Sequence, residues 1–446
     1  MKTSDLHMLS AVDAVAGIRA GRLSSEAYVA ACLKRIDDTD GAIGAWAHLD
    51  PDAAMAQAKE ADRIRKAGRA TGPLHGVPVG LKDVIDTKDM PTERGTPIFA
   101  GRIPDTDSCL VERLKEAGAV IMGKTVTTEL AFVHASETRN PHNPERTPGG
   151  SSSGSAAAVA AGQIPLAIGT QTNGSVIRPA SFNGCFGFKP TRGTISRRGV
   201  LQTSQSLDQV GVFASTIEDA ALLVDAIGCY DPADTGSFAR PRAACLDGAR
   251  AEVPVEPDLL WLDMPYFDRL DDDAREGLDA VLDALGGRVT RMDAAPNMNT
   301  LIDVQLTIHL YEIVHHLEQT FTDEWRALSP SIRPQIEKGR GISMAQYDEA
   351  LEIMASTDAV FADIFNDYDA IIAPSATGQA PPFGPHTGDP IFCTIWTLAG
   401  LPALSMPLLV GNDELPIGVQ LIGGVEEDDR LMRTASWLQK SLQASA

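Results

Sequence analysis

The sequence predicts an α/β fold, in which a central mixed, mostly parallel twisted sheet is covered by helices on both faces. Short apolar runs bounded by turn residues, at 77–81, 119–122 and 166–168, indicate buried strands. Helical patterns lie between these runs, at 109–117 and 155–161. Because strands and helices alternate along the chain, we expect a layered α/β/α arrangement.

Further elements flank this central stretch on both sides. Residues 230–258 contain four prolines and indicate a surface connection. Residues 265–365 are mainly helical and charged. We expect them to form a cap-like segment within a single domain, 1–446, because strands return after them. The remaining patterns predict helices at 8–35, 51–67 and 428–443 and strands at 259–262, 370–373, 403–409 and 418–422.

The charge balance argues against nucleic acids and membrane surfaces as partners. The 446 residues carry 60 acidic and 38 basic side chains, a formal net charge of −22, which repels polyanions. No run approaches the roughly 18 apolar residues of a membrane helix, and the first 21 residues lack the apolar core of a signal peptide. The six scattered cysteines suit a reducing compartment. We therefore expect a cytoplasmic protein.

Two neighbouring segments rich in Gly, Ser and Thr, at 148–162 and 169–179, carry the strongest chemical signal. In the second segment, Asn173 and Gly174 tolerate positive φ and immediately precede Ser175. Such a turn can point several consecutive backbone N–H groups into one spot, as an oxyanion hole requires. We therefore interpret Ser175 as a candidate nucleophile.

A serine nucleophile needs a base, and the histidines do not supply an evident one. The nine histidines are dispersed along the chain, and none lies in a recognisable base motif. Lys82 ends the apolar strand predicted over 78–81. Burial at a strand end removes the solvation of a lysine and lowers its pKa toward that of a useful base.

These segments resemble the amidase signature family. The family's Gly-Gly-Ser-Ser-Gly-Gly-Ser stretch corresponds to 149–155, its strand-end lysine to Lys82 and its nucleophile motif to 169–179. The resemblance is strongest over 72–212, which we expect to be the signature core with the catalytic residues.

The match in detail leaves the serine positions of the family pattern intact. The spacing between Ser151 and Ser175 fits that pattern. Three residues depart from it, because Ser153 replaces a Gly, Gln171 the common Asp and Asn173 the common Gly. These departures leave open to which subfamily the chain belongs and which geometry its oxyanion hole has.

The resemblance implies a Ser–cisSer–Lys triad. Ser175 is then the nucleophile, Lys82 the base, and Ser151, entered through a cis peptide bond, the proton relay between them. The resemblance further implies oxyanion donors at the backbone N–H groups of Thr172, Asn173, Gly174 and Ser175, supporting roles for Thr170, Arg178, Gly150 and Ser152, and substrate contacts at Ala131, Phe132 and Val133. It implies neither a metal nor a cofactor.

The implied reaction is hydrolysis of the C–N bond of an amide, anilide or carbamate through an acyl-enzyme. A urethanase is one form of this activity, and the apolar segment 131–133 favours an aryl or alkyl group over a charged one. We expect a small-molecule substrate and a monomer or homodimer. The alternatives are the glutamine-hydrolysing subunit of a tRNA-dependent amidotransferase complex, which the same family includes, and a catalytically silent scaffold.

Three other patterns allow different interpretations. Residues 118–125 fit the nucleotide-binding pattern GxxxxGK[ST], although their middle residues look like a strand. Ser152 centres a GxSxG motif like that of α/β-hydrolase esterases, although a loop rather than a strand precedes it. His309, Glu312 and His316 share a helical face, where a metal site competes with an amphipathic helix packed on the core.

Overall fold

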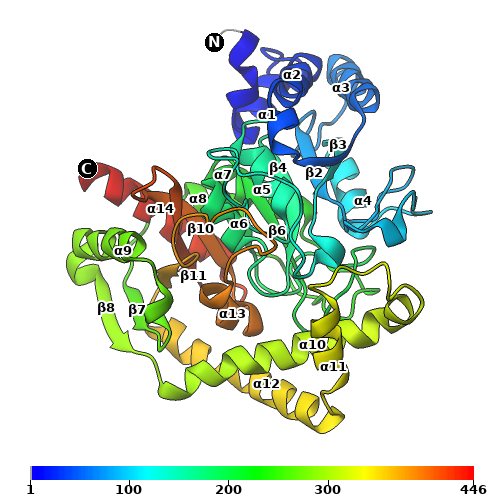
Figure 1. Cartoon of the computed structure of the whole chain (residues 1–446). Helices are drawn as coiled ribbons and strands as arrows, with labels where there is room; N and C mark the ends of the chain where they lie inside the picture. Colours follow the sequence, from blue (N-terminus) through cyan, green and yellow to red (C-terminus); the bar gives the residue numbers. More distant parts are fainter. Residues whose placement is uncertain (1–2, 446) are drawn as a thin grey trace.

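A single eleven-stranded sheet lies at the centre of the molecule in a computed structural model that describes residues 3–445 (Figure 1). Met1, Lys2 and Ala446, at the ends of the predicted 1–446 domain, lie outside the described residues. The strands are β1 (Trp46–Leu49), β2 (Pro78–Lys82), β3 (Val120–Thr125), β4 (Leu166–Gln171), β5 (Phe186–Lys189), β6 (Gln209–Ala214), β7 (Leu259–Asp263), β8 (Val289–Asp293), β9 (Ala370–Pro374), β10 (Ala403–Val410) and β11 (Pro416–Ile422). Their order across the sheet is β1-β3-β2-β4-β6-β5-β10-β11-β9-β7-β8.

The sheet is mixed, as predicted, but the expectation that it is mostly parallel is wrong. Among the described residues, four strand pairings are parallel and six are antiparallel. Strands buried on both faces are apolar along their whole length in either direction, so their sequences do not reveal how they run. The overlooked signal was Gly411-Asn412-Asp413, which lies in the turn between the antiparallel neighbours β10 and β11.

The strands predicted from apolar runs are present as β2, β3, β4, β7, β9, β10 and β11. Four others were missed, because their sequences carry weak strand patterns. Gly187 interrupts β5, and Gly211 interrupts β6, which begins with a polar residue. β8 is a largely exposed edge strand that lies within the mainly helical 265–365 segment.

Helices surround the sheet. The α-helices are α1 (Ala11–Arg19), α2 (Ser25–Ile43), α3 (Pro51–Lys66), α4 (Cys109–Glu116), α5 (Ser153–Ala160), α6 (Ile177–Asn183), α7 (Ile217–Ile227), α8 (Cys245–Arg250), α9 (Asp272–Leu285), α10 (Thr300–Asp323), α11 (Arg333–Arg340), α12 (Met344–Asp367), α13 (Ile391–Leu398) and α14 (Asp428–Ser445). Short 3₁₀ helices occupy Thr3–Met8, Pro97–Phe99, Glu129–Ala131, Phe267–Arg269, Gly286–Arg288 and Pro296–Asn299. The helical pattern over 8–35 is divided between α1 and α2, and the Ser24 side chain begins α2 by accepting a hydrogen bond from the Ala27 N–H.

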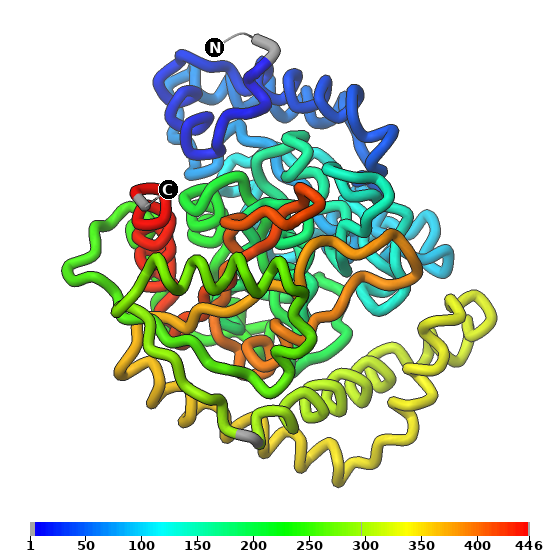
Figure 2. Tube along the Cα trace, turned by 60° about the vertical axis from the view of Figure 1, so that its left-hand side comes forward, coloured from blue at the N-terminus to red at the C-terminus, as the bar shows by residue number. Residues whose placement is uncertain are grey.

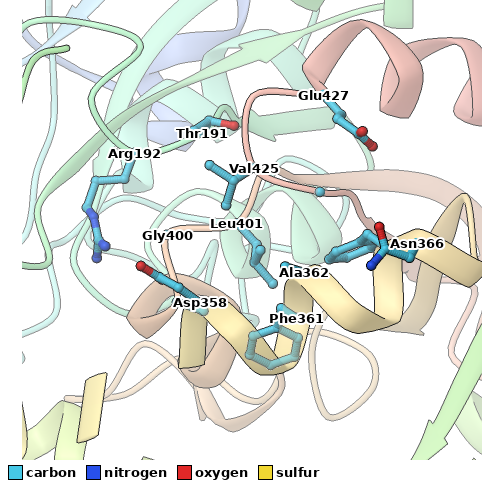
Figure 3. A pocket seen from close by; sticks show the side chains of 13 residues that line it. Thr191, Arg192, Asp358, Phe361, Ala362, Asn366, Gly400, Leu401, Val425 and Glu427 are labelled. Atoms are coloured by element: carbon cyan, nitrogen blue, oxygen red, sulfur yellow. The ribbon is translucent and has the colours of Figure 1, made fainter. Parts of the chain in front are cut away.

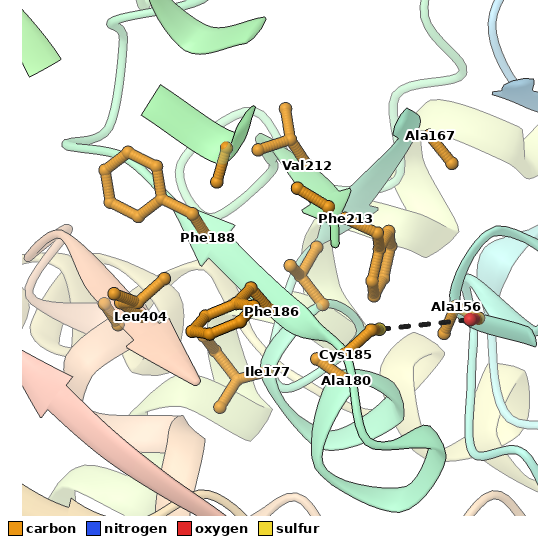
Figure 4. Packing of buried hydrophobic residues seen from close by; sticks show 14 of the residues in the cluster. Ala156, Ala167, Ile177, Ala180, Cys185, Phe186, Phe188, Val212, Phe213 and Leu404 are labelled. Atoms are coloured by element: carbon orange, nitrogen blue, oxygen red, sulfur yellow. Dashed lines mark hydrogen bonds between the residues drawn. The ribbon is translucent and has the colours of Figure 1, made fainter. Parts of the chain in front are cut away.

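Both faces of the sheet are covered, because every residue of β2, β3, β4, β5, β6 and β9 is buried. Figure 4 shows part of this core, where Ile177 and Ala180 of α6 pack beside Phe186 and Phe188 of β5. Helices α1–α3 lie at one end of the molecule and α10–α12 at the opposite end (Figures 1 and 2). None of the described helices is long and apolar enough to cross a bilayer.

Candidate active site

The candidate catalytic groups meet where the parallel neighbours β2 and β4 end. Lys82 is the last residue of β2, Thr170 lies near the end of β4, and the register pairs Leu81 with Ile168. Groups at the carboxyl ends of adjacent parallel strands lie at the same edge of a sheet. Lys82 Nζ accordingly donates hydrogen bonds to Thr170 Oγ1 and to Ser151 Oγ, both at 2.7 Å.

Lys82 has the environment of a lysine that is easily deprotonated. The side chain is 0% exposed, and its described hydrogen-bond partners are both uncharged hydroxyl groups. Burial lowers the pKa of Lys82 to about 7, although the negative charge of Asp208 opposes part of this shift. A substantial fraction of Lys82 is therefore neutral near pH 7 and able to accept a proton.

Ser151 and Ser152 lie just before α5 but point to different partners. The peptide bond between Gly150 and Ser151 is cis, as the resemblance implied. Ser151 Oγ accepts the hydrogen bond of Lys82. Ser152 is completely buried, and its Oγ donates to Thr170 O at 3.2 Å, which ties α5 to β4. The Ser152 hydroxyl is thus buried and hydrogen-bonded to the backbone, so it is not placed to attack a substrate. This does not favour the GxSxG esterase interpretation.

The turn between β4 and α6 exposes a row of backbone N–H groups. Gln171 Oε1 accepts hydrogen bonds from the N–H groups of Val176 (2.7 Å), which precedes α6, and of Ile177 (3.0 Å), its first residue. Within residues 3–445, no hydrogen bond uses the N–H groups of residues 172–175. These donors remain available for a bound oxyanion, and Gln171 therefore acts as a clamp that closes the turn without occupying them.

Asn173 anchors the same turn to two helices. Its Oδ1 accepts a hydrogen bond from Thr394 Oγ1 of α13 at 2.8 Å, and its Nδ2 donates to Gln305 Oε1 of α10 at 3.2 Å. Gln305 Nε2 in turn donates to Thr172 O at 3.0 Å. The two departures from the family pattern in this turn, Gln171 and Asn173, therefore both hold the turn before Ser175 in place.

Arg178 joins the start of α5 to a loop far along the chain. Its Nη2 donates to Gly150 O (2.7 Å) and to Thr387 Oγ1 (3.0 Å), and its Nε donates to Thr387 O (2.8 Å). A Cβ on Gly150 would lie only 2.7 Å from Thr387 Cγ2, so this approach needs glycine. Arg178 is buried and holds these two segments at a fixed separation.

Ser175 and Ser151 open into one cavity of about 490 Å³. Ser175 is half-buried, and its hydroxyl makes no hydrogen bond to any part of the chain between residues 3 and 445. The cavity is lined by Ala131, Phe132, Val133, Ser151, Thr172, Asn173, Gly174, Ser175, Arg178, Leu306, His309, Leu310, Gln335, Lys338, His386, Thr387, Gly388 and Pro390. The structure thus brings the predicted segment 131–133 to the two serines.

Part of this lining could not be recognised in the sequence. The Phe132 ring meets the His309 ring edge-on, with centroids 5.2 Å apart. His309 of α10, Lys338 of α11 and His386 of the 384–390 loop lie in no catalytic motif, and they reach the site only through the tertiary fold. The scattered positions of the histidines in the sequence give no signal that two of them share a cavity.

The nucleotide-binding interpretation of 118–125 does not fit the structure. Residues 120–125 form β3, at whose positions every residue is buried. Lys124 is also buried, and its Nζ donates to Ile85 O and to Thr87 Oγ1 (2.7 Å). A phosphate-binding loop needs open backbone and a free lysine, and this segment provides neither.

The helical face of His309, Glu312 and His316 does not converge on a metal position. Glu312 accepts hydrogen bonds from Ser206 Oγ and Tyr347 OH, both at 2.6 Å, whereas His316 is exposed. The part of the chain that the structure describes holds no group of three His, Cys, Asp or Glu arranged to bind a metal ion. On this face of α10, Glu312 is therefore held by hydrogen bonds, whereas His309 lines the cavity of the two serines.

A second cavity, of about 440 Å³, lies away from the serines (Figure 3). Asp358, Phe361, Ala362 and Asn366 of α12 face Leu401 and other loop residues across it. Its lining contains no serine and no lysine. We therefore place the candidate active site in the cavity of Ser151 and Ser175.

The site has the parts that a serine hydrolase requires. A lysine that titrates near neutrality contacts one serine, and a second serine lies in the same cavity on a turn of free N–H groups. Residues 27–432 match the family described as Amidase, and the chain belongs to this family of enzymes that hydrolyse C–N bonds.

Similar proteins extend over nearly the whole chain. A glutamyl-tRNA(Gln) amidotransferase subunit of Chloroflexus aurantiacus is 34% identical over 475 residues, covering 98% of this chain and 97% of that protein. A chain from the vestigial protein complex that reveals the evolutionary origins of an s-triazine catabolic enzyme has a TM-score of 0.91 and 29% identity, covering 97% and 98%. The peptide amidase of Stenotrophomonas maltophilia has a TM-score of 0.82 and 30% identity, covering 97% of each chain.

Proposed function

We propose that the protein hydrolyses the C–N bond of a small-molecule amide through a covalent ester of Ser175. The observation that carries the proposal is the 2.7 Å hydrogen bond from Lys82 Nζ to Ser151 Oγ, in the cavity that Ser175 also lines. This contact supports a relay in which Ser151 passes a proton from Ser175 to neutral Lys82.

The acylation step uses each of these groups once. Ser175 Oγ attacks the carbonyl carbon while its proton moves to Ser151 Oγ, and the Ser151 proton moves to Lys82 Nζ. The free N–H groups of residues 172–175 receive the negative oxygen of the tetrahedral intermediate. When the C–N bond breaks, the relay runs in reverse and Ser151 protonates the departing amine.

Deacylation repeats the sequence with water as the nucleophile. Lys82 accepts a proton from water through Ser151, the hydroxide adds to the ester carbonyl, and the proton returns to Ser175 Oγ as the carboxylic acid leaves. The net reaction consumes one water and yields one acid and one amine. Thr170, whose Oγ1 also accepts a hydrogen bond from Lys82, keeps Nζ in line with Ser151.

A carbamate presents the same carbonyl and the same C–N bond to Ser175. Hydrolysis of carbamates is therefore chemically possible at this site and stays a prediction. A panel of substrates tests it. Purified enzyme would be offered matched carboxamides, esters and carbamates of one aryl amine, and kcat/KM compared across them. Cleavage of carboxamides alone would rule out a urethanase.

The covalent step is tested directly with a fluorophosphonate probe. We expect the probe to label Ser175, and we expect Ser175→Ala to abolish both labelling and hydrolysis. Ser152→Ala, a substitution in the neighbouring motif, should retain both. Retained labelling in Ser175→Ala together with its loss in Ser152→Ala would overturn the assignment.

A second candidate function follows from the similarity to a glutamyl-tRNA(Gln) amidotransferase subunit. In that role the chain would hydrolyse glutamine within a complex. The purified chain alone, assayed for ammonia release from glutamine and for cleavage of a simple anilide, separates the two candidates. We expect anilide cleavage without any partner chain.

A further inference from the structure

The cavity of the proposed active site has an unusual charge. Its lining includes four basic side chains, from Arg178, His309, Lys338 and His386, and among the described residues that line it there is no Asp or Glu. The whole chain carries 60 acidic against 38 basic residues. Arg178 and Lys338 bring positive charge to this cavity of an acidic protein, whereas burial lowers the pKa of His309, which can therefore take part as a neutral hydrogen-bonding group.

Arg178 makes no direct ion pair within residues 3–445, and the carboxylate that acts on its charge, that of Asp389, is itself paired with Arg269. Arg178 Nε and Nη2 donate to two carbonyl oxygens and one hydroxyl, all uncharged, and Nη1 has no hydrogen-bond partner. A buried charge that is not paired is costly, and a nearby anion removes that cost. The position of Nη1 is close to the nucleophile turn, because a Cβ on Gly174 would lie 3.2 Å from it.

Helices α10 and α11 provide two further hydrogen-bonding groups to the lining of the cavity. His309 is 8% exposed, and its Nε2 has no hydrogen-bond partner. Lys338 is exposed in α11 and makes no ion pair or hydrogen bond with residues 3–445, whereas Arg340 of the same helix pairs with Glu318 (3.0 Å). The third basic residue of α11, Arg333, donates to the carbonyl oxygens of Arg326 and Leu328. Among the described contacts, Lys338 is thus the basic residue of α11 with no partner, and it lines the cavity.

We infer that the substrate of this site is an amide that carries a carboxylate, held by Arg178, His309 and Lys338 in the lining of the cavity. This inference rests on the proposed function and names the substrate class of the same site. The inference also differs from the prediction of an uncharged aryl or alkyl group, which was based on the apolar segment 131–133 alone. That segment forms one side of the cavity, and the basic residues come from parts of the chain that no motif marks.

Matched substrates test the inference. On the acyl side, succinyl and glutaryl 4-nitroanilides would be compared with the neutral butyryl and pentanoyl 4-nitroanilides. On the amine side, 4-acetamidobenzoate would be compared with acetanilide. We expect kcat/KM to be at least about tenfold higher for the charged member on one of the two sides. A neutral member that is equal or better on both sides overturns the inference.

A charge-removing variant ties the preference to the cavity. Lys338→Gln should raise KM for the preferred charged substrate by about three- to fivefold, the size expected for an exposed ion pair, and should raise KM for the neutral partner by less. Lys66→Gln removes the same charge from exposed α3, at the other end of the molecule, and should change neither substrate. An equal effect of Lys338→Gln on charged and neutral substrates would refute the assignment of Lys338.

The proposed function and the carboxylate preference fail separately. If Ser175→Ala abolishes hydrolysis but neutral amides are preferred, the proposed function stands and the carboxylate inference falls. If Ser175→Ala retains hydrolysis of every substrate, the proposed function itself falls.

Discussion

Lys82 offers the sharpest test of the mechanism, through the substitution Lys82→Met. Methionine is close to lysine in length but cannot accept or donate the proton that the relay needs. The two hydroxyls that Lys82 contacts, of Ser151 and Thr170, can rotate toward other acceptors after the change. The fold should therefore survive while the proposed base is lost, and general-base catalysis is typically worth about 10²- to 10⁴-fold in rate.

From the pKa of about 7 for Lys82 we expect a definite pH dependence of kcat/KM in the wild type. Only the neutral amine acts as a base, so kcat/KM should rise about tenfold per pH unit below that value and level off above it. About one tenth of Lys82 is neutral at pH 6 and about nine tenths at pH 8. Lys82→Met should lose this acid limb together with most of the activity.

The substitution Lys82→Met should change stability in the opposite direction to activity. Because burial lowers the pKa of Lys82 below that of an unfolded lysine, the unfolded chain binds a proton that the folded chain does not, between about pH 7 and pH 10. Over that window the free energy of unfolding rises with pH. At pH 7 Lys82→Met removes the cost of burying the amine, and we expect it to raise the free energy of unfolding by about 1 kcal/mol or more.

The assays are kcat/KM from pH 5.5 to 9 and thermal unfolding at pH 7 and pH 9. Lys189→Met is the control, because burial also lowers the pKa of Lys189 to about 7 but its Nζ donates to Gln209 Oε1 (2.7 Å), outside the cavity lining. The control should keep the acid limb. A Lys82→Met enzyme that retains the wild-type limb, or a wild-type profile flat from pH 5.5 to 9, refutes Lys82 as the base.

Three further changes test the surrounding groups. Gln171→Leu removes the acceptor of the Val176 and Ile177 N–H groups. We expect thermal denaturation to show that the free energy of unfolding falls by about 1–3 kcal/mol. Steady-state assays should show a fall in kcat that is larger than any rise in KM. Asp208→Asn removes a charge that raises the pKa of Lys82, so the acid limb of kcat/KM should move to lower pH, and a limb that moves to higher pH would contradict the electrostatic account. Ser152→Ala loses the hydrogen bond to Thr170 O and should lower the free energy of unfolding in urea by about 1 kcal/mol with little change in kcat.

The sequence predicted the strand-end lysine and the serine turn because their signals are local. An apolar run that ends in Lys82, and Asn173-Gly174 before Ser175, are each contained within a few residues, and turn chemistry or strand burial acts over that range. The contact between Lys82 and Ser151 was predicted by the family resemblance and not by these local patterns. Lys82 and Ser151 are 69 residues apart, and it is the parallel pairing of β2 with β4 that brings their segments together.

The rest of the cavity depends on contacts that are longer still. Thr387 lies 209 residues from Arg178 and accepts hydrogen bonds from its guanidinium. His386 lies on the same loop and lines the cavity. No periodicity or motif marks a loop of this kind, because its residues need only a fixed position and not a regular structure. The antiparallel pairing of the predicted strands β9 and β11 was hidden for a different reason, since strands covered on both faces have the same apolar pattern whether parallel or antiparallel.

Helix α10 contacts both the turn before Ser175 and the cavity in which we propose the substrate binds. Gln305 holds the nucleophile turn through Thr172 O and Asn173 Nδ2, and His309, one helical turn later, lines the cavity beside Phe132. Residues at this spacing lie on the same helical face, so a shift of α10 that reshapes the cavity also displaces the turn with the free N–H groups. Substitutions on α10 that alter the substrate preference must therefore leave the helix in place. The neighbouring α11 does not hold this turn, so substitutions at Lys338 can change the preferred substrate charge with less effect on the turn.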